Sequence, residues 1–232
     1  MELDRKLVLE KLRDKGITHL YHANTVATAC TFLRQGGLLS RGAVEARGLY
    51  QTPQNSDDID KKFNVWNDIF FDSIDLHTFF SRQNHYGPVL FKFNIDVLSY
   101  DQLPPIWVTK DNPTRWKKGE NNYFLTIEDF ESEYSLGKYR EMITLRNTTE
   151  VLPFIPYLEE IILDDPKLMI KSDDTIFLNA AADALRKELN ESGFDYSHVT
   201  RKYRDCSSNF CYCLSNYKGQ VGIQKLKDKF LI

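Results

Sequence analysis

Hydrophobic and polar positions alternate along the chain in short stretches, most of them too short for long helices. The clearest unit spans residues 17–41, where an apolar strand ends in Tyr21 and His22 and a polar break follows. A helix is expected from about Val26 to Arg34, because Gly36-Gly37 lies where a helix C-cap needs positive φ. The pattern therefore predicts a strand, a polar turn and a capped helix in immediate succession.

The remaining pattern predicts short strands with few long helices. Residues 3–15 and 175–189 are expected to form amphipathic helices. Strands are expected within residues 65–71, 88–97, 139–145, 155–163 and 210–214, and an edge strand or turn with two prolines at 103–108. Residues 42–64 lack periodicity and predict a long loop. Together these elements predict a single α+β domain over residues 1–232.

The amino-acid composition indicates a folded globular protein but does not indicate what it binds. The 232 residues are 42% hydrophobic and 13% aromatic, which excludes global disorder and allows one large core. The net charge is −3, so nothing in the total announces a nucleic-acid-binding protein. A local basic strip can still be hidden in a neutral total.

The cysteines give little sign of a metal centre. Cys206, Cys211 and Cys213 cluster near the C-terminus in a C-x4-C-x-C spacing that is unusual for zinc, and Cys30 stands apart. A zinc site that also uses His198 is the alternative, but thiols in a reducing cytoplasm are the preferred interpretation, and no metal is predicted. No apolar opening segment and no run of eighteen apolar residues occurs, so we expect a cytoplasmic protein without membrane spans.

The strand end at residues 21–25 carries the first candidate chemistry. An imidazole and several free backbone amides at one strand end suit a polar, phosphate-bearing ligand. Asn24 or Thr25 offers the oxygen that would cap the helix. A core histidine bonded to a backbone carbonyl is the plainer interpretation of His22. His19 lies three positions earlier, so strand alternation places it on the opposite face.

These residues resemble the opening of the ADP-ribosyltransferase superfamily, in which a Tyr-His strand end precedes a helix and Gly-Gly-Leu-Leu. The spacing from Tyr21 to Leu39 is most similar to DarT-like toxins, which transfer ADP-ribose from NAD onto nucleic acid. The proline-containing step and Glu-Glu-Ile-Ile-Leu strand at residues 153–163 are also similar. The resemblance implies a split β-sheet core with flanking helices, NAD as substrate, and a toxin–antitoxin or anti-phage role with a neutralising protein partner.

Glu141 is the expected catalytic carboxylate. Transfer of ADP-ribose passes through an oxocarbenium-like transition state, whose positive charge a carboxylate can stabilise while it orients the acceptor. Glu141 opens an apolar strand after a long loop, which matches where this superfamily places its glutamate. A solvated glutamate at a strand edge is the plainer alternative. Arg47 loosely matches a DarT-like arginine near the reaction centre, with Arg41 as its competitor.

The resemblance also implies a set of NAD contacts. It places contacts at His22, Ala23, Asn24 and Leu39. From the residues themselves, Tyr50, Phe70, Phe71 or Phe80 could stack on the nicotinamide ring, and His77 could orient the ligand. DarT-like proteins carry Arg-Ser-Pro after the aromatic strand, whereas this chain has Asp75 and His77 in that region. The nicotinamide contact therefore does not follow from the family pattern in this region. Asp72 or Asp75 could instead cap a helix.

The loop before Glu141 is expected to choose the acceptor. Arg115, Lys117 and Lys118 surround Trp116, and Tyr123 follows, a mixture of cations and aromatics that suits single-stranded DNA or RNA. The acidic residues 128–133 that follow favour an ordinary solvated face instead. A protein acceptor, or a catalytically inactive binding module of the same fold, remains the alternative function.

Overall fold

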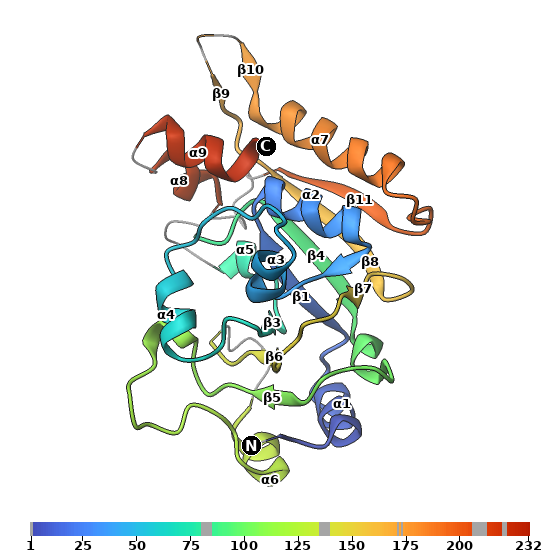
Figure 1. The fold of residues 1–232 in the computed structure, drawn as a ribbon, viewed down its shortest axis with the longest axis vertical. Helices are drawn as coiled ribbons and strands as arrows, with labels where there is room; N and C mark the ends of the chain where they lie inside the picture. Colours follow the sequence, from blue (N-terminus) through green and yellow to red (C-terminus); the bar gives the residue numbers. More distant parts are fainter. Residues whose placement is uncertain are drawn as a thin grey trace.

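Two β-sheets share the centre of the molecule (Figure 1). The computed structural model describes residues 2–79, 85–134, 140–170, 172, 174–205, 213–219 and 222–232. Its architecture is α+β, as the hydrophobic pattern predicts, and it has the split sheet with helices around it that the resemblance implies.

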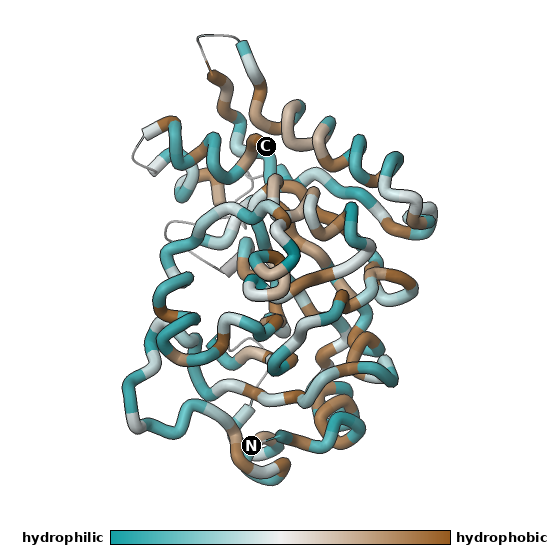
Figure 2. Tube along the Cα trace, viewed as in Figure 1, coloured by the Kyte–Doolittle hydropathy of each residue, from teal (hydrophilic) through white to brown (hydrophobic). Residues whose placement is uncertain are grey.

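The larger sheet has four strands in the order β1-β4-β8-β11. Neighbouring strands are antiparallel except for β11, which runs parallel to β8. The strands span β1 His19–Asn24, β4 Val89–Asn94, β8 Leu158–Asp165 and β11 Thr200–Asp205. In Figure 2 the central β4 and β8 are mostly hydrophobic, in keeping with their position between two neighbours.

The smaller sheet has three antiparallel strands in the order β3-β6-β5. These are β3 Ile69–Phe71, β6 Ile143–Leu145 and β5 Ile106–Val108. The two sheets meet where Tyr21 and Asp72 form an isolated antiparallel bridge, with N–H···O distances of 2.8 and 2.9 Å in the two directions. This bridge sets the end of β1 against the end of β3.

Helices and shorter strand pairs surround the sheets (Figure 1). Helix α2 packs against α7, and α1 packs beside the 3₁₀ helix η1. The helices are α1 Arg5–Asp14, α2 Val26–Gln35, α3 Arg41–Ala46, α4 Asp57–Lys62, α5 Leu76–Phe79, α6 Ile127–Glu133, α7 Phe177–Glu191, α8 Cys213–Lys218, α9 Ile223–Phe230, η1 Ile95–Ser99 and η2 Pro113–Arg115. The short pairs are β2 Gly37–Leu38 with β7 Leu152–Pro153, and β9 Met169–Ile170 with β10 Thr175–Ile176. None of the described helices is long and apolar enough to cross a membrane.

Local chemistry explains the strand–helix unit. The Thr25 hydroxyl accepts from the Thr28 amide and caps α2, and Gly36 ends the helix with φ of +72°. Gly37 then pairs with Pro153, and a Cβ there would collide with the carbonyl oxygen of Leu152. The two glycines therefore serve different purposes, one a left-handed turn and the other a close approach between strands.

Aromatic packing holds the sheet to the loop after β7. Phe91 stacks on Phe154 at a ring-centroid distance of 5.0 Å, and Phe93 contacts the same ring at 5.8 Å. Phe71 of the smaller sheet meets Phe93 edge-on at 5.4 Å. The core thus runs continuously from one sheet to the other.

Several expected elements differ from the structure. The loop expected at residues 42–64 contains α3 and α4, whose ends are set by side-chain and backbone contacts that periodicity does not record. The strand expected from residue 139 begins at Ile143, and residue 139 itself lies outside the described part. Cys213 and Leu214 are helical rather than extended, and residues 210–212 of that expected strand are not described.

Candidate functional site

A cavity opens where the end of β1 meets the start of α2. Together with the open space at its mouth it measures about 860 Å³. Residues far apart in sequence converge on it from the strand end, the α3–α4 region, β3 and η2. Its lining includes His22, Ala23, Asn24, Phe32, Leu39, Arg41, Gln51, Gln54, Asp60, Asp68, Ile69, Phe70, Asp72, Tyr86, Asn112, Pro113, Thr114 and Met142.

His22 presents a hydrogen-bond acceptor at this cavity. Its Nδ1 lies 2.9 Å from the carbonyl oxygen of Phe70, and because a carbonyl only accepts, Nδ1 carries the proton. The buried Nε2 has no hydrogen-bond partner among the described residues. Burial lowers the pKa of His22, so the ring is neutral near pH 7. A bound ligand with a hydroxyl or N–H group would satisfy Nε2.

A threonine network fixes the floor beside His22. The Oγ1 atoms of Thr25 and Thr52 lie 2.7 Å apart, and the Thr28 hydroxyl accepts from the Thr52 amide at 3.0 Å. Asn24 Oδ1 accepts from the Thr25 amide at 2.9 Å. These buried contacts hold residues 51–54 against the first turn of α2, so this part of the cavity is preformed.

Arg41, rather than Arg47, is the arginine at the cavity. Arg41 lines the cavity and pairs with Asp57 at 2.7 Å from Nε to Oδ1. Arg47 ends α3 and donates to the Thr149 carbonyl at 2.9 Å, on a contact outside the cavity lining. The structure therefore places Arg41 and not Arg47 in the cavity lining, and the role expected of Arg47 at the reaction centre stays a prediction.

Three carboxyl groups line the cavity, and burial raises the pKa of each. Burial raises the pKa of Asp60 and of Asp68 to about 6 each, in spite of an ion pair from Asp68 to Arg146 at 2.8 Å. Burial also raises the pKa of Asp72 well above its ordinary value. At neutral pH the cavity therefore carries less negative charge than its three aspartates suggest.

Asp60→Asn should change how stability depends on pH. The folded-state pKa of Asp60, about 6, exceeds its ordinary 3.8, so its stabilising contribution is complete below the lower value and is lost as pH rises through the higher one. Urea unfolding should show that the wild type loses roughly 1–3 kcal/mol relative to Asp60→Asn between about pH 4 and about pH 7. The exposed Asp58 on the same helix gives the control, Asp58→Asn. Identical pH profiles for the two variants would contradict the assignment.

Glu141 is buried but stands behind the cavity wall. Its side chain is 6% exposed, and it lies in the segment before β6 rather than on the strand. The next residue, Met142, lines the cavity, whereas Glu141 does not. Burial raises the pKa of the nearby Tyr134, and the charge of Glu141 adds to this effect. The sequence led us to expect that Glu141 and His22 face each other across one cleft. In the structure Glu141 is next to a residue of the cavity lining but is not part of that lining.

Three further expected NAD contacts lie elsewhere. Phe71 is fully buried against Phe93 and does not line the cavity, while its neighbour Phe70 does. Tyr50 is 61% exposed and does not line the cavity either. Neither residue lies in the cavity lining, and nor does His77, which is described next. The structure brings together His22, Ala23, Asn24 and Leu39 at the cavity.

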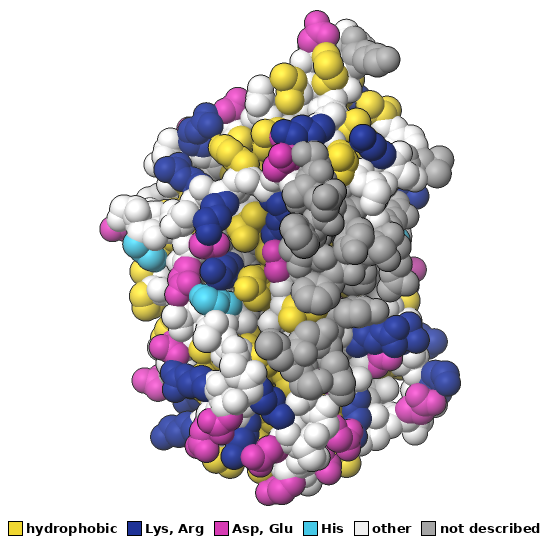
Figure 3. Space-filling view, turned by 180° about the vertical axis from the view of Figure 1, so that it is seen from behind, with side chains coloured by type: hydrophobic (Ala, Val, Ile, Leu, Met, Phe, Trp, Pro, Cys, Tyr) yellow, Lys and Arg dark blue, Asp and Glu magenta, His cyan; other side chains and the backbone are white. Residues whose placement is uncertain are grey.

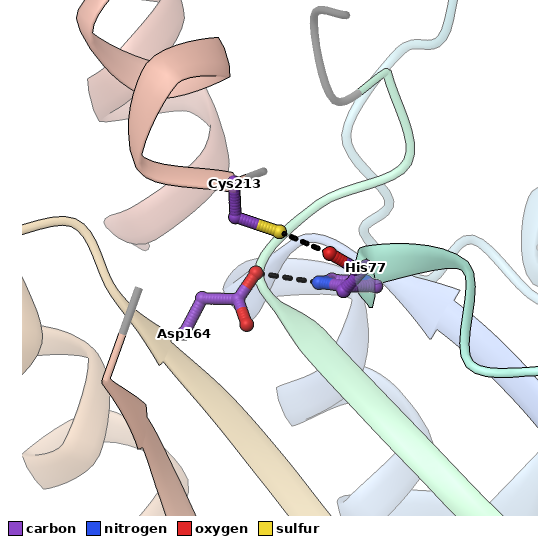
Figure 4. Close-up of side chains that lie close together, drawn as sticks. All are labelled: His77, Asp164 and Cys213. Atoms are coloured by element: carbon purple, nitrogen blue, oxygen red, sulfur yellow. Dashed lines mark hydrogen bonds and ion pairs between the residues drawn. The ribbon is translucent and has the colours of Figure 1, made fainter. Parts of the chain in front are cut away.

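His77 belongs to a separate buried cluster with Asp164 and Cys213 (Figure 4). Its Nδ1 lies 2.5 Å from Asp164 Oδ2, and the Cys213 thiol donates to the His77 carbonyl oxygen at 3.2 Å. One potential metal-ligand atom from each residue lies within 4.8 Å of the others. Arg204, however, has its Nε 3.6 Å from Asp164 Oδ1, and a metal cation beside that guanidinium would be electrostatically unfavourable. The cluster is better suited to tying α5, β8 and α8 together.

The structure describes only two of the four cysteines that the sequence analysis interpreted as thiols. Cys30 and Cys213 are buried free thiols. Cys206 and Cys211, the other members of the alternative zinc site with His198, lie outside the described residues.

The predicted acceptor residues follow directly on the cavity mouth. Pro113 and Thr114 line the cavity, and Arg115, Lys117 and Lys118 are exposed immediately after them. Trp116 is only 8% exposed. This burial corrects the expectation that the Trp116 ring is open to a base.

Aromatic contacts explain the burial of Trp116. Its ring packs between Phe63 at 5.6 Å and Tyr123 at 5.1 Å, and its Nε1 donates to the Asp111 carbonyl. Tyr123 is also engaged, because its hydroxyl accepts from Arg146 at 2.7 Å. The tryptophan and tyrosine therefore anchor the loop, and its lysines remain the groups available to a partner.

Comparisons with known proteins give structural neighbours only. No protein-family model matches the sequence, and no curated protein matches it. Solved structures of DarT from Thermus sp. 2.9 are similar in complex with ADP-ribosylated ssDNA (12% identity, TM-score 0.49, 82% of this chain and 95% of that chain) and with NAD+ (13%, 0.44, 81% and 96%). The carba-NAD+ complex of the same protein gives 11% identity, a TM-score of 0.44, and coverage of 81% and 96%.

Sequence reasoning passed over two polar residues of the cavity. Asp68 and Asp72 flank the strand Ile69–Phe71, and the sequence suggested only a helix-capping role for Asp72. The available signal was an acidic residue directly after an apolar strand, but its position in the cavity lining depends on the bridge to Tyr21.

Proposed function

We propose that the protein is an NAD-dependent ADP-ribosyltransferase whose cavity holds NAD as substrate. The observation that carries the proposal is the buried, unpartnered acceptor of His22, which faces a preformed cavity at the strand end where the Tyr-His motif resembles that superfamily. A ribose hydroxyl is a suitable donor for Nε2. Phe70, Ile69 and Met142 supply an apolar wall for a flat ring.

The chemistry assigned to the site needs a carboxylate at the ribose. Transfer breaks the bond between the nicotinamide nitrogen and ribose C1′, and a new bond forms from C1′ to the acceptor, which gives up a proton. Glu141 stabilises the positive charge on the ribose and takes up that proton. The next residue, Met142, lines the cavity, so Glu141 lies directly beside the proposed NAD site in the chain. Arg41 supplies the positive charge for the NAD phosphates, and its guanidinium then contacts both Asp57 and a phosphate.

The proposed acceptor is a nucleobase in single-stranded DNA or RNA. Arg115, Lys117 and Lys118 continue from the cavity mouth, which places exposed cations where a strand would approach. On the face in Figure 3, acidic and basic side chains are interleaved over the described residues, so this face offers no continuous basic strip there. The cations after the cavity mouth are therefore the preferred nucleic-acid contact. In this proposal the protein is the toxin of a toxin–antitoxin or anti-phage system, and a neutralising protein is its partner in the cytoplasm.

Incubation with NAD and labelled DNA and RNA oligonucleotides tests the proposal directly. We expect release of nicotinamide and a mass gain of one ADP-ribose on one of the oligonucleotides. Modification of proteins in a cell lysate, with neither oligonucleotide changed, would indicate a protein acceptor. NAD binding without any turnover would indicate a binding module. Absence of NAD binding would overturn the proposal.

His22→Ala should weaken NAD binding by about tenfold, the effect of one lost buried hydrogen bond. His19→Ala is the matched control, because His19 lies on the same strand and pairs with Glu159 at 2.9 Å instead of lining the cavity. Isothermal titration calorimetry with NAD measures both variants. Equal affinities for the two would show that the His22 ring does not contact the ligand.

A further inference from the structure

Asp72 is fixed at the cavity by its backbone. Its amide and carbonyl both bond to Tyr21, so the residue cannot shift without breaking the junction between the two sheets. The side chain is 6% exposed and lines the same cavity as His22. A rigid backbone and a buried side chain together give its carboxyl group a defined position.

The surroundings of Asp72 do not support a negative charge. Its Oδ1 is buried without a hydrogen-bond partner among the described residues, and no ion pair reaches it within them. Asp57 and Asp68, by contrast, pair with Arg41 and Arg146. An unpaired buried carboxylate is costly, and a buried acid instead takes up a proton. The raised pKa of Asp72, caused by burial, agrees with a neutral group.

Among the residues that the structure describes, the other ionisable groups at this site do not supply the missing positive charge. His22 is neutral, and Arg41 is held by Asp57. The remaining groups are carboxylic acids, whose negative charge disfavours a second one, and phenols, which are neutral and add no positive charge. They are Asp60 from α4, Asp68 before β3, Tyr86 before β4, Tyr134 after α6 and Glu141 before β6.

A neutral carboxyl group has a donor and an acceptor side by side. A primary carboxamide has the complementary pair, an acceptor C=O and a donor NH₂, in one plane. Given the proposed function, on which this step rests, we infer that Asp72 binds the carboxamide of the nicotinamide ring of NAD as a neutral acid. The apolar wall of Ile69, Phe70 and Met142 then covers the face of the ring. Asp72 is a positioning residue, which selects and orients the leaving group.

Ligand titrations at several pH values test this inference. The proteins are the wild type, Asp72→Asn, Asp72→Ala and Asp60→Asn as a cavity carboxyl control. The ligands are NAD and ADP-ribose, which lacks the nicotinamide. Asn is always neutral and keeps both a donor and an acceptor, so it should bind NAD with an affinity that does not change with pH.

We expect the NAD affinity of the wild type to fall as pH rises through the folded-state pKa of Asp72, by up to about tenfold per pH unit above it. At about pH 6, Asp72→Ala should bind NAD about tenfold more weakly than wild type, and Asp72→Asn should bind equally well. ADP-ribose affinity should be the same for wild type and both Asp72 variants. For Asp60→Asn, the NAD affinity should fall with pH above the pKa of Asp72 as it does in the wild type.

Three results would overturn the inference. NAD binding that is equal in wild type, Asp72→Asn and Asp72→Ala at every pH would show that the carboxyl does not contact the ligand. If the Asp72 variants lose equal affinity for NAD and for ADP-ribose, Asp72 contacts the ADP-ribose part that the two ligands share. Failure of the wild type to bind either ligand would overturn the proposed function, and this inference with it. Should Asp72→Ala fail to fold, the pH profiles of wild type and Asp72→Asn alone decide.

Discussion

Glu141→Gln is expected to slow ADP-ribosyl transfer by roughly 10²–10⁴-fold. Gln has the same shape but can neither balance positive charge on the ribose nor take up the acceptor proton. The side chain is buried, and the amide fills the same space, so folding and NAD affinity should be nearly unchanged. Single-turnover mass spectrometry of the modified oligonucleotide measures the rate, and calorimetry measures NAD binding.

The exposed Glu128 on α6 supplies a matched control for this experiment. Glu128→Gln should leave the transfer rate within about twofold of wild type, because surface substitutions rarely matter. In bacteria, expression of wild type and Glu128→Gln should stop growth, and Glu141→Gln should not. Wild-type rates for Glu141→Gln would exclude it as the catalytic carboxylate and leave the cavity without an assigned one.

Arg204→Met is expected to lower the free energy of unfolding by about 3–5 kcal/mol. The guanidinium is 11% exposed, and it bonds both oxygens of Asp75, at 3.1 and 2.5 Å, and faces Asp164 Oδ1 at 3.6 Å. Burial favours loss of its charge, but Asp164 and Asp75 outweigh burial and raise the pKa of Arg204. Without the arginine, the buried Asp164 and the partly buried Asp75 lose this counter-charge beside the His77 cluster.

Arg201→Met separates this effect from a general effect on β11. Arg201 lies on the same strand with an exposed side chain, so its replacement should cost less than about 1 kcal/mol. Urea unfolding of the two variants and wild type gives both values. A loss for Arg204→Met no larger than for Arg201→Met would show that the arginine does not stabilise the fold through Asp75 and Asp164.

Short-range signals made part of the site predictable. The Thr25 cap and the left-handed Gly36 act within a few residues, so the position of α2 and of the strand end before it could be derived from the pattern. The opposite facing of His19 and His22 follows from strand alternation and is confirmed by their contacts with Glu159 and Phe70. The sequence was weaker where α3 and α4 replace the loop, because those helices show no apolar face of their own.

The sequence by itself determined the α+β class, the strand–helix unit and the histidine at its junction, because caps and periodicity are encoded by neighbours along the chain. Only the tertiary structure decided that Arg41 rather than Arg47 meets the cavity, that Asp72 lines it, and that Trp116 and His77 are buried away from it. Each of those outcomes depends on a partner brought from a distant part of the chain, such as Asp164 for His77. Burial and pairing at such contacts set both the charge and the direction of a side chain, and no local pattern records them.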